Sequence, residues 1–196
     1  MKMIESLTDN LIRKGHIPQE DRDIYLYGFD ITFYTIWSTV ALLLIGLALQ
    51  QFWAAVIIVS LFYTFQSTGG GYHAKSHLAC LLTMILGLLA GLGFVFFRKW
   101  TFVLWVFFGI GSVLLFSFPL VLHPNKSFLN AKRGPLTIRS EITTLFLMSC
   151  VIALNIYWNR YLHSFSAAFL LSGLSRIAGK IIYDREVIPN KMKHWI

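Results

Sequence analysis

Apolar residues of this chain gather in six runs that are separated by polar connections of different lengths. The runs cover residues 31–49, 52–66, 78–97, 101–122, 142–158 and 161–183. Most are close to the ~20 residues that an α-helix needs to cross a membrane, whereas the second run is short for a full crossing. The pattern predicts an all-α integral membrane protein with about six transmembrane or half-embedded helices. Four full spans with two half-embedded segments would fit equally.

The N-terminal part of the chain is polar and mixed in charge, but its apolar positions recur at helical spacing. Those positions are Leu7, Leu11, Ile12 and Ile17. Residues 1–30 are therefore predicted to form an amphipathic cytoplasmic leader, with a short helix that lies on the membrane surface. A polar leader that packs on the bundle is an equal alternative. Pro18, which follows Gly15, is expected to stop this helix.

Nothing in the pattern suggests a second fold, so residues 1–196 are interpreted as a single membrane domain. Residues 31–183 form its helical bundle and residues 184–196 form a basic cytoplasmic tail. Composition agrees, because 56% of the residues are hydrophobic and only 13% are charged. Soluble domains carry roughly 25% charged residues. With a mean hydropathy of +0.64, the chain is expected to have lipid as its main solvent.

The formal net charge of +8 raises the question of nucleic acid as a partner. In so apolar a chain the charge is better explained by basic loops that set the topology and contact anionic lipid, so no nucleic acid is expected. With six spans, thirteen Lys and Arg residues fall on one side and three on the other. This asymmetry predicts a multi-pass cell-membrane protein with both termini in the cytoplasm. Arg176 remains inside the last span, where it either snorkels or lines a polar cavity.

A polar interruption at residues 69–80 holds the side chains with chemistry, namely His73, His77 and Cys80. If a helix begins near His73, the three stand at i, i+4 and i+7 on one helical face. If the helix begins later, His73 lies on a loop that can fold back over its start. Both arrangements place Cys80 in the first turns, where the positive end of the helix dipole favours a thiolate. Spare backbone N–H groups there would serve as an oxyanion hole for acyl transfer.

A metal site is the main alternative for these side chains. His73, His77 and Cys80 would supply three ligands, but structural zinc usually takes four, and no acidic residue lies near them in sequence. No metal and no cofactor are therefore expected. Cys150 lies in the middle of a span and is interpreted as an apolar filler. The two cysteines match neither a disulfide scaffold nor a repeated metal motif.

Candidate substrate contacts come from the glycine run and from the basic loop after the fourth apolar run. Three consecutive glycines permit close backbone approach by an extended substrate, which nominates Gly70 and Gly71, although loop flexibility alone would also explain them. The basic residues of the loop are Lys126, Lys132, Arg133 and Arg139. We hypothesise that they attract an acidic part of a peptide, but their role in setting topology explains them as well.

The sequence Gly-Gly-Tyr-His-Ala at residues 70–74, followed by Cys80, resembles the signature of the accessory gene regulator protein B family, AgrB. Residue identity rests chiefly on 69–80, whereas the layout is similar over nearly the whole chain. The family consists of membrane peptidases of Gram-positive bacteria that process the precursor of a cyclic quorum-sensing peptide. The resemblance assigns the nucleophile to Cys80 and the catalytic histidine to His73, while His77 lies outside the matched positions.

The resemblance also implies a mechanism and a partner. The Cys80 thiolate would attack the carbonyl at the cleavage point of an AgrD-like precursor peptide, with His73 acting as base and then as acid. A thioester forms, the C-terminal tail leaves, and a cysteine or serine of the substrate closes a thiolactone or lactone ring. The active site would face the cytoplasm. A homodimer is left open.

Two other classes of function remain open. A membrane transporter or exporter of a small peptide or anion would use Arg176 and the basic loops as its binding path. Internal repeats would favour that class, and none is visible in the sequence. A non-enzymatic membrane scaffold is the third class, and it predicts that Cys80 is dispensable.

Overall fold

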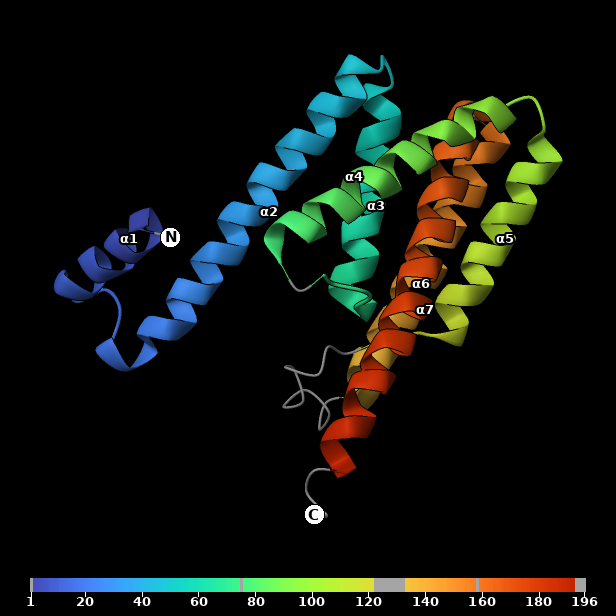
Figure 1. The fold of residues 1–196 in the computed structure, drawn as a ribbon. Helices are drawn as coiled ribbons and strands as arrows, with labels where there is room; N and C mark the ends of the chain where they lie inside the picture. The colour runs from blue at the N-terminus through green and yellow to red at the C-terminus, as the bar shows by residue number, and fades with distance from the viewer. Residues whose placement is uncertain (1, 75, 122–132, 158, 193–196) are drawn as a thin grey trace. The chain divides into compact units, whose positions relative to one another are not determined.

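A computed structural model describes residues 2–74, 76–121, 133–157 and 159–192 (Figure 1). Its helices are α1 Lys2–Arg13, α2 Arg22–Ala48, α3 Phe52–Gly69, α4 His77–Gly93, α5 Thr101–Ser117, α6 Arg133–Tyr157 and α7 Leu162–Met192. Short 3-10 turns lie at η1 Gln19–Asp21, η2 Phe94–Phe97 and η4 Asn159–Tyr161. Over the described residues there is no β-strand, only an isolated bridge between Gly70 and Val121. The prediction of an all-α protein is confirmed.

Five of the described helical segments are long and apolar enough to cross a membrane. They cover Gln19–Ala48, Phe52–Gly69, His77–Phe97, Gly134–Asn155 and Leu162–Tyr183. Helix α5 is also apolar but shorter, with 17 residues. These segments correspond to the six predicted runs, so the chain is a multi-pass membrane protein of about six transmembrane or half-embedded helices.

The chain divides into two compact units, Met1–Ala41 and Leu42–Ile196, which are described separately. In the first unit, Arg22 at the start of α2 forms an ion pair with Asp9 of α1, with Nε and Oδ1 2.9 Å apart. This contact ties the two helices of the unit together. The interpretation of residues 1–196 as a single domain stays a prediction.

Helix α1 has the amphipathic character expected of the leader. Ile4 and Thr8, one turn apart, are both buried, whereas the described charged side chains of the helix are not. The helix ends at Arg13 because Gly15 adopts φ +72, a left-handed conformation that closes a helix C-terminus. The expectation that Pro18 stops the helix is therefore wrong, since the glycine does so first.

Helix α2 begins at Arg22, well before the predicted start of the first span at residue 31. Pro18 is extended, with ψ 146°, and the turn η1 then leads directly into the helix. The predicted boundary followed the last charged residue, Asp30, but the helix begins well before it, so Arg22, Asp23 and Asp30 all lie in its first turns. The leader of residues 1–30 thus contains the first part of α2.

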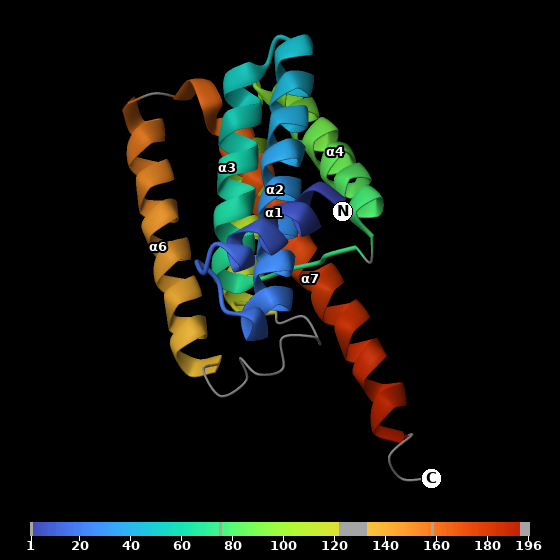
Figure 2. The ribbon, with the colours of Figure 1, turned by 90° about the vertical axis from the view of Figure 1, so that its left-hand side faces the viewer.

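Helix α7 is the central element of the second unit, since it packs against α3, α4, α5 and α6. Figure 1 shows α7 beside α5, and Figure 2 shows α6 running alongside α3. Glycines bring α5 and α7 close together. A Cβ at Gly111 would lie 2.5 Å from the backbone nitrogen of Leu170, and one at Gly173 would lie 2.7 Å from Cβ of Leu114. Small residues at such contacts let membrane helices approach each other closely.

Two clusters of buried apolar side chains surround α7. The first joins the end of α2 to α3, α4 and α7 through Leu42, Ala54, Ala55, Ile58, Val59, Leu88, Leu92 and Ala167. The second joins α3, α5, α6 and α7 through Phe65, Phe108, Leu115, Val151 and Phe169. In the second cluster the Phe169 ring lies 5.0 Å from that of Phe65 and 4.6 Å from that of Phe108. This aromatic contact fixes the position of α7 along its axis relative to α3 and α5.

Helix α5 ends at Ser117 and not at residue 122, where the fourth run was predicted to end. Proline disfavours the helical conformation of the residue before it, and Pro119 follows Phe118 directly. Phe118 accordingly leaves the helix, with φ −127 and ψ 65. Residues 119–121 continue as non-helical backbone, and Val121 reaches the glycine run.

Helix α6 begins at Arg133, well before residue 142, where the fifth apolar run was predicted to begin, so residues 133–141 of the predicted basic loop are helical. Pro135 lies in the first turn, where a missing N–H costs nothing because the first N–H groups of a helix have no intrahelical partner. At the other end of the chain, α7 continues to Met192. The segment predicted as a tail, residues 184–196, is thus helical as far as the structure describes it.

Candidate active site

The glycine run closes the C-terminal end of α3 and is held by its own chain. The carbonyl oxygen of Gly69 accepts a hydrogen bond from Val121 N–H at 2.8 Å. A Cβ at Gly69 would overlap the guanidinium of Arg176, and a Cβ at Gly70 would overlap the carbonyl oxygen of Val121. Gly70 also has φ +71, which glycine adopts readily. These internal contacts explain two of the glycines, and substrate binding by Gly70 and Gly71 stays a prediction.

After the glycines the chain runs along α7, and this contact places His73. Tyr72 N–H donates to the carbonyl oxygen of Ser175 at 3.0 Å, and His73 N–H donates to Tyr183 Oη at 2.8 Å. The Tyr183 hydroxyl in turn donates to the carbonyl oxygen of Gly71 at 3.2 Å. The main chain of this segment is therefore fixed on α7, while His73 itself is exposed.

Helix α4 begins at His77, so Cys80 lies in its first turn. Ser76 caps the helix: its Oγ accepts from Ala79 N–H at 3.2 Å, and its carbonyl oxygen accepts from Cys80 N–H at 2.9 Å. The helix thus starts late, and His73 lies on the segment before it. The Cys80 thiol is free and half-buried, in the region where the helix dipole stabilises an anion. The N–H groups of Ala79 and Cys80 are already bonded to Ser76, so neither is spare for an oxyanion hole.

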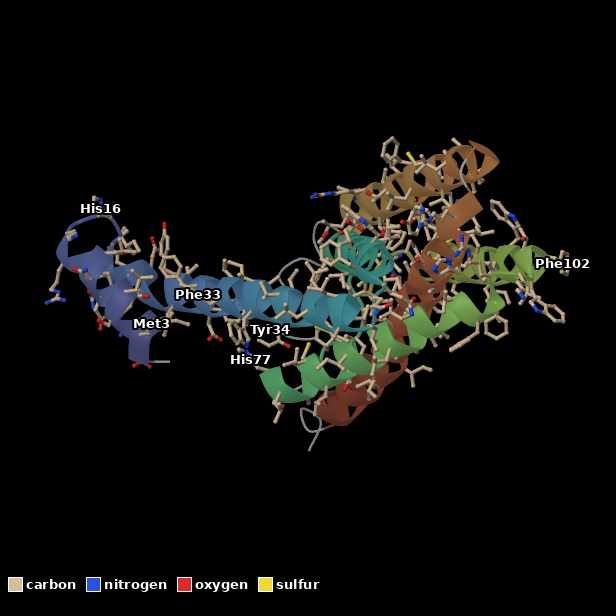
Figure 3. All side chains as sticks on the ribbon, turned by 90° about the horizontal axis from the view of Figure 1, so that it is seen from above. Met3, His16, Phe33, Tyr34, His77 and Phe102 are labelled. Atoms are coloured by element: carbon tan, nitrogen blue, oxygen red, sulfur yellow. The ribbon has the colours of Figure 1, made fainter. Side chains whose placement is uncertain are left out.

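His77 is exposed at the first position of α4, as Figure 3 shows. It shares the first turn of that helix with Cys80, whereas His73 does not. Within the described residues, no three His, Cys, Asp or Glu side chains gather closely enough to hold a metal ion. His73, His77 and Cys80 therefore do not form the alternative three-ligand site in this structure.

Arg176 of α7 is fully buried, with 0% of its surface exposed. The two terminal nitrogens of its guanidinium donate to carbonyl oxygens near the ends of α3 and α5 and to one hydroxyl of α6. The acceptors are the carbonyl oxygens of Phe65, Leu115, Phe118 and Pro119 and Oγ of Ser140, at 3.0 to 3.3 Å. Arg176 therefore does not snorkel, and its buried guanidinium is surrounded by these acceptors. It ties three helices to α7 directly behind the glycine run.

The basic residues expected to attract a peptide are only partly described. Lys126 and Lys132 lie outside the described residues. Arg133 is the first residue of α6, and only its main chain is described. Arg139 is exposed on the first part of α6. The role of Lys126, Lys132 and Arg133 in substrate binding stays a prediction.

The face of α7 that holds the His73 segment was missed by sequence analysis. Ser175, Gly179 and Tyr183 follow one another at four-residue spacing, so they lie on one helical face. Gln66 of α3 reaches the same face, because its Nε2 donates to Ser175 Oγ at 2.8 Å. The available signal was a repeat of small or polar residues inside an apolar run, and that pattern also marks ordinary helix contacts. This repeat could be recognised as a binding face for the segment that carries His73 only from the structure, which shows that segment packed on it.

Comparisons with known proteins agree on one family. The sequence model of the family described as Accessory gene regulator B matches residues 3–176 of this chain. AgrB-like protein 2 of Clostridium perfringens (strain 13 / Type A) is 27% identical over 171 residues, which cover 80% of each chain. No solved structure matches this chain. The matched range contains His73, Cys80 and Arg176, and it ends before Tyr183.

Proposed function

Because this chain belongs to the accessory gene regulator B family, we propose that it is a membrane cysteine endopeptidase that processes a small AgrD-like precursor peptide. Family membership connects the chain with the accessory gene regulator system, and its apolar helices make it a multi-pass membrane protein. One observation carries the proposal: Cys80 occupies the first turn of α4, directly after the segment that presents His73.

In the proposed reaction Cys80 supplies the nucleophile and His73 moves the proton. His73 takes the thiol proton, and the thiolate forms a sulfur–carbon bond to the carbonyl at the cleavage point of the precursor. Collapse of the tetrahedral intermediate breaks the carbon–nitrogen bond of the peptide. The protonated His73 returns its proton to the departing amine. A thioester remains on Cys80 while the C-terminal tail of the precursor leaves.

A thiol or hydroxyl of the bound peptide then attacks this thioester. The new sulfur–carbon or oxygen–carbon bond closes a thiolactone or lactone ring, the bond to Cys80 breaks, and the thiol regains a proton. Exchange between thioesters is nearly neutral in energy, so a thiolactone forms without ATP. Water would compete as a nucleophile, which is a reason to place the chemistry at the edge of a membrane.

The distribution of basic residues supports a cytoplasmic site. With six spans, thirteen Lys and Arg residues would fall on the side of the His73 segment and three on the other, an asymmetry typical of the cytoplasmic face. On that side Lys126, Lys132 and Arg133 provide positive charge that would attract an acidic tail of the precursor. Anionic lipid at the same face would be held by the same charges.

The test is cleavage of a tagged precursor, with an amphipathic leader, a central cysteine and an acidic tail, in membranes that contain the full chain. Cys80→Ala and His73→Ala are each expected to lower the cleavage rate by on the order of 1,000-fold, because they remove the nucleophile and its base. Cys150→Ala is the matched control for the thiol and is expected to keep full activity. His77→Ala is the matched control for the imidazole and is expected to keep at least part of it.

Two results would contradict this assignment. Cleavage by Cys80→Ala at the unsubstituted rate would remove the thiolate mechanism altogether. Loss of activity in His77→Ala, together with activity in His73→Ala, would transfer the role of base from one histidine to the other. Accumulation of a hydroxylamine-sensitive adduct on Cys80 would support the thioester step directly.

A further inference from the structure

One face of α7 binds the segment that carries His73. Ser175 accepts from Tyr72 N–H through its carbonyl oxygen at 3.0 Å, and its hydroxyl oxygen lies 3.2 Å from the same nitrogen. One turn later, Gly179 leaves room for the segment, since a Cβ there would lie 2.9 Å from the Tyr72 nitrogen. One further turn on, Tyr183 bonds the main chain on both sides of Tyr72. Three successive turns of α7 therefore form a track for this segment.

The Tyr183 hydroxyl is the bridge at the end of this track. It accepts from His73 N–H at 2.8 Å and donates to the carbonyl oxygen of Gly71 at 3.2 Å. A phenol has one proton to donate and lone pairs to accept with, so both bonds form at once. Tyr183 is only 5% exposed, and hydrogen bonds shielded from water in this way are stronger than exposed ones. The Tyr183 hydroxyl thus contributes two buried hydrogen bonds that hold the main chain on both sides of Tyr72.

We propose that Tyr183 is a positioning residue, whose hydroxyl holds the His73 main chain where the imidazole reaches the Cys80 thiol. This inference rests on the proposed function, because Tyr183 acts only through His73. A misplacement of about 1 Å in an active site costs on the order of 100-fold in rate. Tyr183 lies beyond residues 3–176, the range that matches the family. Its role follows from the contacts of α7 in this chain.

Removal of the hydroxyl leaves the rest of the track in place. Tyr183→Phe keeps the buried aromatic ring and deletes both hydrogen bonds to the segment. Ser175 still holds Tyr72, one residue before His73. The expected result is a folded protein in which the imidazole is misplaced.

The reactivity of the Cys80 thiol toward iodoacetamide measures this placement without a peptide substrate. The full chain is used in detergent micelles with Cys150→Ser, which leaves Cys80 as the remaining one of the two cysteines. His73→Ala is expected to slow alkylation about tenfold, and Tyr183→Phe about three- to tenfold, because a paired imidazole keeps the thiol reactive. In the His73→Ala background, Tyr183→Phe is expected to have no further effect. Non-additivity of this kind is the signature of a residue that acts through another.

Two further variants separate positioning from general damage. Tyr161→Phe removes the same atom just before the opposite end of α7 and is expected to leave alkylation unchanged. Gly179→Ala pushes the segment off α7 with the Tyr183 hydroxyl intact, so it is expected to slow alkylation as Tyr183→Phe does. A thermal unfolding curve for each variant establishes that it is folded.

The outcomes distinguish a positioning role of Tyr183 from a general structural effect, and both from the absence of the proposed dyad. Equal slowing by Tyr183→Phe with and without His73 would mark a general structural effect and overturn the positioning role. Slowing by His73→Ala, combined with full reactivity of Tyr183→Phe, would overturn it as well and would leave the proposed dyad standing. Unchanged alkylation in His73→Ala would remove the dyad, and with it both the proposed function and this inference.

Discussion

Replacement of Arg176 by methionine tests whether one buried guanidinium holds the ends of two helices together. Its terminal nitrogens bond four carbonyl oxygens and the Ser140 hydroxyl. Three of the carbonyls lie in the last turn of α5 and just after it, and the fourth lies near the end of α3. The three carbonyls at the end of α5 lack intrahelical partners, and lipid offers no donors to replace them. The Phe65 carbonyl lies within α3 and also accepts from Thr68 Oγ1 at 3.4 Å, so it depends less on Arg176. A methionine side chain would fill the volume and supply none of these bonds.

The magnitude follows from the number of protons that Arg176 can donate. Its two terminal nitrogens carry four protons, so at most four linear hydrogen bonds form at once. At about 0.6 kcal/mol each, the average found in a membrane protein, four bonds contribute about 2.4 kcal/mol. At about 1.5 kcal/mol each, the lower value for bonds to a charged group, they contribute about 6 kcal/mol. Arg176→Met is therefore expected to lower the free energy of unfolding by about 2.4 to 6 kcal/mol.

Unfolding in mixed micelles titrated with a denaturing detergent, followed by tryptophan fluorescence, measures this change. Arg139→Met removes the same charge at an exposed position of α6 and is the matched control, expected to stay within about 0.5 kcal/mol. Arg176→Lys keeps the charge but gathers three protons at one point, so it is expected to recover only part of the loss. A loss below about 1 kcal/mol for Arg176→Met, or one equal to the control, would refute the reasoning.

Two further changes probe helix contacts and turns by the same unfolding measurement. Gly111→Ala is expected to destabilise the protein by about 1 to 3 kcal/mol, because the new Cβ meets the backbone nitrogen of Leu170 at 2.5 Å. Gly109→Ala, with nothing within 4 Å, is its control and is expected to be neutral or mildly stabilising. Gln50→Gly is expected to stabilise by roughly 0.5 to 1 kcal/mol, because Gln50 has φ 57 in the turn after α2. Leu49→Gly should destabilise, and a gain from both glycines would contradict this account.

The helices could be predicted from the sequence because the length of an apolar run is a direct consequence of membrane thickness. Their ends were less predictable, since a helix continues past the last apolar residue until something stops it. Pro119 was a readable signal for the end of α5, and Gly15 was one for the end of α1. For the start of α2, by contrast, the residues between Arg22 and residue 31 include Gly28, but an isolated glycine is tolerated inside a helix, so no residue there marked a boundary.

The local part of the site was also within reach of the sequence. Ser76 precedes the apolar run that contains Cys80, and serine before such a run is a typical helix cap. Because Ser76 is the cap, the helix begins at the later of the two predicted starts, and His73 does not lie on its helical face. The contact that places His73 was out of reach, because Tyr183 is 110 positions away and no periodic pattern connects them. Pairing of residues so far apart is decided by helix packing alone.

The burial of Arg176 also separates the peptidase hypothesis from the exporter hypothesis. An exporter that bound an anion at this guanidinium would have to free it from the carbonyls of α3 and α5 in every cycle. That step costs about 2.4 to 6 kcal/mol on the estimate above, which the bound anion would have to offset. A peptidase, by contrast, would need the guanidinium to stay bonded to these carbonyls throughout its cycle. The guanidinium also occupies the space that a side chain on Gly69 would take. The buried Arg176 therefore helps to fix the glycine run and the segment that leads to His73. Arg176 is thus better suited to holding the proposed site still than to passing a substrate along the membrane.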